Sequence, residues 1–253
     1  YLDLYQKFIP TRQESYKLDY IGKVELGIRK DENPYETFRD WYTKDFQSFI
    51  DYNIKDVEIV DGLEDKLKLI ELILTMAYEA KVNYNDVFSQ VRMWDMLIYN
   101  FLRKENIVIP PKEDNVKEDK YDGAYVKDPL TGMHKWVVSF DINSLYPHLI
   151  MQYNISPEKI IGVKSSGISV AKLLKQQTPL SHLKTEGACI TPNGAMFKND
   201  NPGFLPRLLE KMYNDRVKFK KLEFQSKQEY QKTKDKDLTK KIATYHNIQW
   251  AKK

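Results

Sequence analysis

The sequence predicts an α+β protein in which two mainly helical parts flank a part made of strands and turns. Residues 61–109 carry apolar side chains at helical spacing. Residues 121–200 have the character of strands and turns, with one short helix after Pro147. A second helical region begins at Pro206, because proline in the first helical turn loses no hydrogen bond that the helix needs. These three observations place the chain in the α+β class.

Length and composition exclude several classes of protein. The 253 residues are 42% hydrophobic, enough to bury a core in one large domain or in parts of two. No segment approaches the roughly 20 apolar residues that cross a bilayer, so no membrane partner is expected. The single Cys189 excludes an internal disulfide framework and a thiolate zinc site, and the four histidines show no HExxH spacing. The start, Tyr1-Leu2-Asp3, has neither an initiator Met nor a targeting segment, which indicates a piece of a longer protein.

The first helical part contains two predicted segments and ends in a linker. Within residues 1–60, an amphipathic helix is expected to begin near Ser15, whose hydroxyl can cap it. In residues 61–109 one apolar stripe is expected to face the core, formed by Leu63, Leu67, Ile70, Leu74 and Ala77. Residues 110–120, PPKEDNVKEDK, are rich in proline and charge, which predicts a linker between two lobes.

The stretch KWVVSFDINSLYPHLIMQYN, residues 135–154, contains the most informative strand prediction. The apolar run Trp136–Val138 leads into Phe140 and Asp141, so a core strand that ends on a carboxylate is expected. A dry, unpaired carboxylate is destabilising by several kcal/mol. Asp141 therefore either meets a positive charge or lies in water.

A carboxylate at a strand end, with a turn behind it, has a geometry that can hold a divalent cation. One oxygen of Asp141 and the backbone carbonyl of Ile142 can both bind a hard metal such as Mg²⁺, whose other ligands are usually water and substrate phosphates. The backbone N–H groups of Ser144 and Leu145 would then be free to contact those phosphates. The alternative is a solvated strand terminus, and the local chemistry alone favours that alternative.

The last part of the chain is strongly basic. From residue 203 onward, fourteen basic residues stand against six acidic ones, a net charge of +8, so the rest of the chain sums to −4. This asymmetry suggests an element that meets phosphates. The alternative is a solvated helical hairpin with a mixed-charge surface. Its tip is expected in the polar residues 224–237, and its returning helix is expected to reach the last residue.

Two short strings favour a metal-binding role for Asp141 over a solvated strand end. DINSLYP (141–147), followed by NISPE (154–158), resembles the first polymerase motif, DxxSLYP, of the B-family DNA polymerases, in particular the replicative polymerases of T-even-type bacteriophages and their marine relatives. Further strings match in the family's order. They are SYKLDYI (15–21), Leu26-Gly27 and YNIKD (52–56) for the proofreading exonuclease, YDGAYV (121–126) for the link to the polymerase, and TPNGAMF (191–197) with GFLPRLLEKMYNDRVKFKK (203–221) for the approach to the fingers and their first helix.

This resemblance implies a domain organisation. Residues 1–109 would be the C-terminal part of an RNase H-like 3′–5′ exonuclease domain, followed by the linker at 110–120. Residues 121–202 would be the N-terminal part of a polymerase palm, with antiparallel strands and helices. Residues 203–253 would be the incomplete helical hairpin of the fingers.

The resemblance also implies roles in nucleotide addition. Asp141 would be catalytic and would hold a metal ion together with the carbonyl of Ile142, while Ser144 and Leu145 would bind the nucleotide through their backbone. Tyr146 would be a steric gate, lying under the sugar so that a 2′-hydroxyl clashes. Packing of Tyr146 in the core is the alternative, and it is partly compatible with a gate.

Three cations complete the implied nucleotide site. Arg216 and Lys220 are four residues apart on the first fingers helix, a spacing that lets both face one anion. The alternative for this pair is a solvated helix face. Lys253 would be the family's triphosphate-binding lysine, with Lys252 in its place if the register slips by one.

The exonuclease resemblance assigns roles to a second pair. Tyr52 and Asp56 are four residues apart and thus on one helix face. Asp56 would be catalytic and hold a metal ion, while the Tyr52 phenol would orient the attacking water. As a lone pattern, two such residues on a surface helix carry little weight. In the linking element, Tyr121 and Gly123 would contact DNA.

The implied activity is addition of dNTPs to a primer 3′-hydroxyl by two-metal phosphoryl transfer, with an associated 3′–5′ proofreading exonuclease. The implied cofactor is Mg²⁺, two ions per active site, for which Mn²⁺ can substitute. The implied partners are primer-template DNA, dNTPs and, through parts not present here, a sliding clamp and other replisome proteins. The protein would be virus-encoded and act in the cytoplasm of an infected bacterial cell.

Some features of the family do not occur in these residues. The second acidic motif, containing DTD, does not occur, and the first two exonuclease motifs would lie before Tyr1. Both active sites would be half present, so the 253 residues alone are expected to be inactive. His148 stands where the family often has Ser or Thr, and it either faces DNA or packs. A non-catalytic nucleic-acid-binding module and one half of a split polymerase stay open, whereas the intact DxxSLYP motif argues against an exonuclease without polymerase activity.

Overall fold

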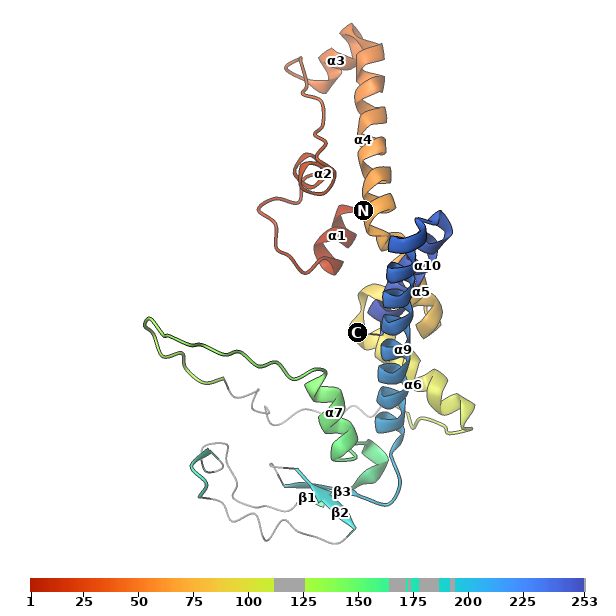
Figure 1. Cartoon of the computed structure of the whole chain (residues 1–253). Helices are drawn as coiled ribbons and strands as arrows, with labels where there is room; N and C mark the ends of the chain where they lie inside the picture. The colour runs from red at the N-terminus through yellow and green to blue at the C-terminus, as the bar shows by residue number, and fades with distance from the viewer. Residues whose placement is uncertain (112–125, 164–171, 173, 178–186, 192–193, 253) are drawn as a thin grey trace. The chain divides into compact units, whose positions relative to one another are not determined.

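The computed structural model describes residues 1–111, 126–163, 172, 174–177, 187–191 and 194–252 (Figure 1). They form two compact units, unit 1 with Tyr1–Met93 and Lys218–Lys253, and unit 2 with Trp94–Val217. The first elements are α1 (Leu2–Phe8), α2 (Leu18–Leu26), α3 (Phe38–Lys44), α4 (Phe46–Leu67), α5 (Leu69–Ala80), the 3-10 helix η1 (Tyr84–Phe88) and α6 (Gln90–Lys104). Next come α7 (Leu145–Gln152), the 3-10 helix η2 (Pro157–Lys159), β1 (Ile160–Val163), β2 (Ala188–Ile190), β3 (Ala195–Lys198), α9 (Phe204–Thr233) and α10 (Lys236–Ala251). Helices with a small sheet make the predicted α+β class.

The helices predicted within 61–109 are present, but the chain breaks at Lys68. This residue takes a left-handed conformation, φ 52° and ψ 40°, that ends α4 and begins α5. The break changes the helical phase, so the predicted stripe is not one face. Leu63 is buried, whereas Ile70 and Leu74 are exposed. The buried face of α5 is made instead by Leu69, Leu72, Ile73, Ala77 and Ala80.

A hydrophobic core joins α1, α2, α4, α5 and η1 of unit 1. Its buried members are Leu4, Tyr5, Ile21, Ile59, Leu63, Leu69, Leu72, Ile73, Ala77 and Val87. Trp250 of α10 packs against the same core. Each fully buried large side chain contributes about 1.5–3 kcal/mol. The core therefore anchors the C-terminal half of α4, whose N-terminal half carries Tyr52 and Asp56.

Helix α2 begins later than its sequence predicts. The helix expected near Ser15 starts at Leu18, and the Ser15 hydroxyl accepts the Lys17 N–H at 3.3 Å in the turn that precedes it. Helix α2 ends at Gly27, whose φ of 74° suits a residue without a Cβ. From this turn the chain runs on to Lys30.

Unit 2 contains an antiparallel sheet in the order β1-β3-β2. The central strand pairs Phe197 with Ile160 on one side and with Cys189 on the other. A register shift between Ile160 and Gly162 interrupts the ladder of β1 and β3. The sheet matches the prediction of short strands in this part of the chain.

The core strand predicted at residues 136–140 is wrong. No strand occurs at these residues, and Trp136, at φ 57°, is 98% exposed. A positive φ at a bulky residue is incompatible with a regular strand. A strand also needs a neighbour to satisfy its backbone groups, and none of the strands in the described residues pairs with this segment. Asp141 therefore follows an exposed segment.

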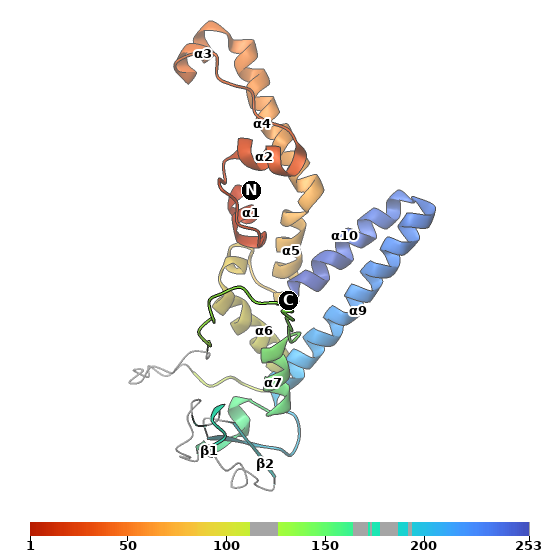
Figure 2. The same cartoon turned by 60° about the vertical axis from the view of Figure 1, so that its left-hand side comes forward.

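The helical region predicted from Pro206 forms the hairpin of α9 and α10 (Figure 2). Its tip is shorter than the predicted 224–237, because α9 continues to Thr233. The chain turns at Lys234, with φ 57°, and the Asp235 carboxylate caps α10. None of the helices in the described residues has the length and apolar character to span a membrane.

Candidate functional site

The motif DINSLYP forms a turn that begins α7. Ser144 is left-handed, with φ 54° and ψ 44°, and its carbonyl accepts the His148 N–H at 3.1 Å. The first N–H groups of a helix have no acceptor inside that helix. Those of Leu145 and Tyr146 are therefore directed out of the first turn, while Pro147 has none to direct. The start of α7 thus offers backbone donors beside the Ser144 hydroxyl, at the positive end of the helix dipole.

Arg216 of α9 lies against this turn. Its Nη1 donates to the Ser144 hydroxyl oxygen at 3.4 Å. One turn earlier on α9, the Tyr213 ring packs edge-on against the His148 ring, with 4.8 Å between centroids. The His148 Nδ1 lies 2.9 Å from the Ser144 carbonyl oxygen. Two residue pairs therefore hold α9 beside the start of α7. His148 remains exposed but contacts Tyr213 through its ring.

The acidic and aromatic residues of the motif are open to solvent. Asp141 is exposed, and Tyr146 is 69% exposed. Within the described residues, no group of three or more His, Cys, Asp or Glu side chains is arranged to hold a metal ion. One exposed carboxylate with the neighbouring Ile142 carbonyl supplies oxygen donors that Mg²⁺ accepts. The motif therefore fits one part of a metal site, and further ligands must come from other groups.

The remaining predicted polymerase residues lie on α9 or outside the described residues. Lys220 lies one turn beyond Arg216 on α9, and its side chain is exposed. This spacing keeps both cations on one face of the helix. Tyr121, Gly123 and Lys253 lie outside the described residues, as does most of the linker predicted at 110–120.

Lys30 joins Tyr52 and Asp56. The Lys30 Nζ is 2.7 Å from the Asp56 Oδ2 and 4.8 Å from the centroid of the Tyr52 ring. The Lys30 N–H donates to the Asp19 carboxylate at 3.0 Å, which fixes the loop after α2. The buried Trp41 packs on Tyr52, with 4.9 Å between the centroids of the two rings. The two predicted exonuclease residues, Tyr52 and Asp56, therefore both contact the ammonium group of Lys30.

The charges of this cluster are partly withdrawn from water. Burial disfavours the charged form of Lys30, yet its pKa is raised, because its interactions with Asp56 and Tyr52 outweigh the loss of hydration. The side chains of Lys30 and Asp56 are each 24% exposed. The Asp56 Oδ1 is buried and has no hydrogen-bond partner in the described part of the chain. This unpaired carboxylate oxygen fits a divalent cation, because it is a hard donor that is otherwise unsatisfied.

Sequence patterns did not identify Lys30. It precedes Tyr52 by 22 residues and belongs to no periodic segment or motif. Its place near Asp56 follows from the packing of α2 on α4 in unit 1. The nearest local signal is Gly27, which can end a helix and redirect the chain.

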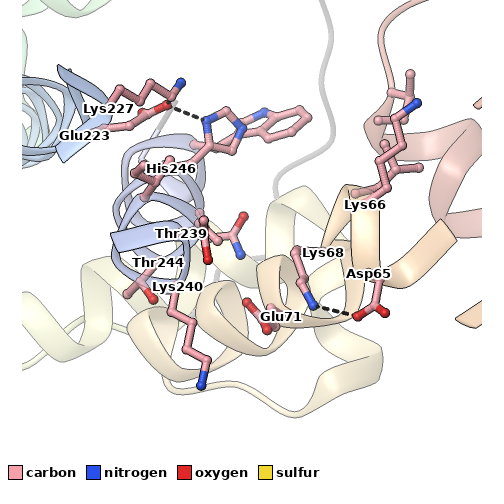
Figure 3. A pocket seen from close by; sticks show the side chains of 16 residues that line it. Asp65, Lys66, Lys68, Glu71, Glu223, Lys227, Thr239, Lys240, Thr244 and His246 are labelled. Carbon is pink, nitrogen blue, oxygen red and sulfur yellow. Dashed lines mark hydrogen bonds and ion pairs between the residues drawn. The ribbon is translucent and has the colours of Figure 1, made fainter. Parts of the chain in front are cut away.

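Unit 1 also contains a cavity of about 940 Å³ between the α4–α5 junction and the α9–α10 hairpin. Figure 3 shows that charged side chains of both signs line it. The Glu223 Oε1 accepts from the Lys227 Nζ at 2.6 Å and lies 3.2 Å from the His246 Nδ1. The Lys68 Nζ lies 3.1 Å from the Asp65 Oδ1. Because acidic and basic side chains both line it, the charge of the lining favours neither an anion nor a cation.

Comparison with known proteins identifies what this chain is similar to. A sequence profile of DNA polymerase family B matches residues 85–243. Over 222 residues the chain is 38% identical to the DNA-directed DNA polymerase of Escherichia phage RB69, covering 87% of this chain and 24% of that protein. Over 225 residues it is 33% identical to the DNA-directed DNA polymerase of Enterobacteria phage T4, covering 88% of this chain and 24% of that protein. It is 30% identical to DNA polymerase 1 of Sulfolobus acidocaldarius over 185 residues, 63% of this chain and 21% of that protein.

The chain spans about a quarter of the length of the two phage relatives. The family profile includes DINSLYP, Arg216 and Lys220, whereas Tyr52 and Asp56 precede its first matched residue. The cluster at the start of α7 therefore lies inside the residues that the profile matches, and the Lys30 cluster lies before them.

Proposed function

Because this chain belongs to DNA polymerase family B, we propose that it forms part of a virus-encoded DNA polymerase that adds dNTPs to a primer 3′-hydroxyl on a DNA template. The observation that carries this proposal is the hydrogen bond from Arg216 to Ser144. It sets a guanidinium beside the N-terminus of α7, and this combination of cation and backbone donors suits a phosphate group. Viral origin is supported by the similarity to the phage proteins.

The triphosphate would bind at the start of α7. Backbone N–H groups at Ser144 and Leu145 would donate to phosphate oxygens, and Arg216 would approach the same anion from α9. Lys220 adds a second cation one turn further along that helix. Lys253, or Lys252 in a shifted register, would supply a third.

Asp141 and the Ile142 carbonyl would hold one divalent cation. Mg²⁺, or Mn²⁺ in its place, two ions per active site, would supply charge neutralisation at the phosphates and activation of the primer hydroxyl. The exposure of Asp141 supports this role, because its oxygens are accessible to an ion.

Tyr146 would select deoxyribose by exclusion. Tyr146 stands in the first turn of α7, next to Pro147, and most of its side chain is accessible. A sugar that lies against the ring would have no room for a 2′-hydroxyl. Discrimination would then come from a clash rather than from a hydrogen bond.

A second activity, 3′–5′ excision, is favoured by the cluster of Lys30, Tyr52 and Asp56. Asp56 would hold a metal ion, with its buried Oδ1 as a donor. Tyr52 would orient the water that attacks the phosphodiester. Lys30 holds both side chains in place through its ion pair and ring contact.

The domain assignments follow the same proposal. Residues 1–109 would be the end of an RNase H-like exonuclease domain, 121–202 the start of the palm, and 203–253 part of the fingers. The partners would be primer-template DNA, dNTPs and, through other regions, a sliding clamp and replisome proteins, in the cytoplasm of an infected bacterial cell. Residues 1–253 alone would be inactive, because each proposed site needs further carboxylates. A non-catalytic nucleic-acid-binding module and half of a split polymerase are the alternatives.

Primer extension tests the proposal. In the polymerase that contains this chain, Asp141→Asn should abolish dNTP addition while primer-template binding survives. Asp128→Asn, a matched change at another exposed carboxylate, should leave both unchanged. Extension at the wild-type rate by the Asp141→Asn protein would refute the metal role. A chain that binds DNA but shows no extension in its wild-type form would favour the non-catalytic alternative.

A further inference from the structure

The string NISPE has a structural partner far away in the sequence. Its alternate residues Asn154, Ser156 and Glu158, here called the NISPE clamp, accept hydrogen bonds from three successive backbone N–H groups at the start of α9. The bonds are Gly203 N to Asn154 Oδ1 at 2.8 Å, Phe204 N to Glu158 Oε1 at 2.7 Å, and Leu205 N to Ser156 Oγ at 3.3 Å. The clamp therefore caps a helix that begins about 45 residues later.

The clamp is itself rigidly held. Ser156 is 1% exposed, and its hydroxyl donates to the Glu158 Oε2 at 2.6 Å. The buried Asn154 amide donates to the carbonyls of Lys198, at the end of β3, and of Asn201. Because these side chains bond to one another, to β3 and to the start of α9, the clamp joins the sheet and the first turn of α9 in one hydrogen-bond network.

Two features of α9 leave little freedom at this junction. A Cβ built on Gly203 would lie 2.5 Å from the Ser156 Cβ, closer than real atoms approach. Pro206 has no N–H. The N–H groups at the start of α9 that need an acceptor are therefore those of Gly203, Phe204 and Leu205, which the clamp side chains accept. The contacts of the clamp with the first turn of α9 therefore fix the direction of the helix axis.

Electrostatics favour the same arrangement. Burial alone would raise the pKa of Glu158, but its pKa is lowered, because Ser156 and the Phe204 N–H donate to the ionised carboxylate. A negative charge at a helix N-terminus also interacts favourably with the helix dipole. Beside the clamp, the Lys159 Nζ pairs with the Asp200 Oδ1 at 2.6 Å. Glu158 thus caps α9 in its charged form.

We propose that Asn154, Ser156 and Glu158 are positioning residues for nucleotide binding: they aim α9 so that Arg216 reaches the start of α7. This inference rests on the proposed role of Arg216. The two ends are 12 residues apart on α9, about 18 Å of helix, so a tilt of about 10° at the clamp displaces the guanidinium by about 3 Å. Such a displacement breaks the 3.4 Å contact with Ser144.

Steady-state primer extension by the polymerase that contains this chain tests the proposal. Glu158→Ala should raise the KM for dNTP by about tenfold or more, because misplacement of a binding group weakens the productive complex. Its affinity for primer-template DNA should be unchanged. Glu158→Gln should restore most of the loss, since its amide oxygen can still accept from Phe204. Glu210→Ala, at an exposed carboxylate on the same helix, is the matched control and should leave the KM unchanged.

Ser156→Ala provides a second, smaller perturbation, which keeps the proposal testable if Glu158→Ala fails to fold. It should raise the KM for dNTP in the same direction. An unchanged KM in the folded clamp variants would overturn the positioning role.

A double-mutant cycle separates this inference from the proposed function. In an Arg216→Ala background, Glu158→Ala should add no further increase in KM, because the clamp acts through Arg216. Independent, multiplicative effects would overturn the proposal. If Arg216→Ala by itself leaves the KM unchanged, the proposed nucleotide site fails. If Arg216→Ala raises the KM and the clamp variants do not, the positioning role alone fails.

Discussion

The Lys30 Nζ lies 2.7 Å from the Asp56 Oδ2 and also contacts the Tyr52 ring. This ion pair makes a specific prediction for excision. Lys30→Met keeps the length of the side chain and removes the charge, which should release Asp56 and Tyr52 from their relative positions. We expect 3′–5′ excision of single-stranded DNA to fall by about 10²-fold, the effect of misplaced catalytic groups.

The control for that experiment is Lys23→Met, at an exposed lysine of α2. It should leave excision unchanged. Wild-type excision by the Lys30→Met polymerase would contradict a role for Lys30 at this site, and primer extension by both variants should match that of the wild type.

Substitution of Tyr146 should relax sugar selection. Tyr146→Ala removes the ring that the proposed gate requires, and we expect incorporation of ribonucleotides relative to deoxyribonucleotides to rise by about 10- to 100-fold. Competition of each rNTP with its dNTP in primer extension measures this ratio. Tyr78→Ala, at a highly exposed tyrosine of α5, should not change it. An unaltered ratio in the Tyr146→Ala protein would place the gate elsewhere.

Gly203 and Gly162 offer a matched test of packing at the clamp. A Cβ on Gly203 would meet Ser156 at 2.5 Å, whereas one on Gly162 would meet nothing within 4 Å. Gly203→Ala should lower the free energy of unfolding by about 1–3 kcal/mol, the usual effect of overpacking. Gly162→Ala should be nearly neutral. Urea unfolding of both variants measures the difference, and equal stabilities would show that the junction accommodates a methyl group.

The ion pair of Lys159 and Asp200 predicts a dependence of stability on pH. The pKa of Asp200 is lowered to about 2, because Lys159 and the Asn201 N–H donate to its carboxylate. A carboxylate whose pKa is lower in the folded state stabilises the fold above its unfolded pKa of about 3.9. That contribution is lost as the pH falls from about 4 toward about 2.

Asp200→Asn should therefore be less stable than the wild type at neutral pH, and the two should converge as the pH falls through this window. Thermal unfolding at several pH values measures the gap. Because Asp200 is largely exposed, the gap should be small and should shrink at high salt. A gap that persists at the lowest pH would assign the stabilisation to contacts other than the ion pair.

The sequence predicted elements that depend on local pattern and missed those that packing decides. Apolar spacing indicated the helices after residue 60, but nothing in the pattern marked the break at Lys68, a residue type that seldom adopts a positive φ. The run at Trp136–Phe140 had strand composition, yet composition does not supply the neighbouring strand that pairing requires.

The candidate site divides in the same way. Tyr52 and Asp56 are near each other because helical spacing places them so, and this was predictable. The contact between Ser144 and Arg216 joins residues 72 positions apart, and only resemblance to a family pointed to both. The string NISPE could be identified in the sequence. Its partner could not be predicted, because the donors at the start of α9 are backbone N–H groups, which almost every residue type has.

The most direct test of the central claim is a structure of the polymerase containing this chain with primer-template DNA, a dNTP and Mg²⁺. The account predicts an oxygen of Asp141 at about 2.1 Å from a magnesium ion, with Arg216 on the triphosphate and the Tyr146 ring under the sugar. A nucleotide bound with the Asp141 carboxylate far from every ion, and Arg216 turned away from the phosphates, would contradict it.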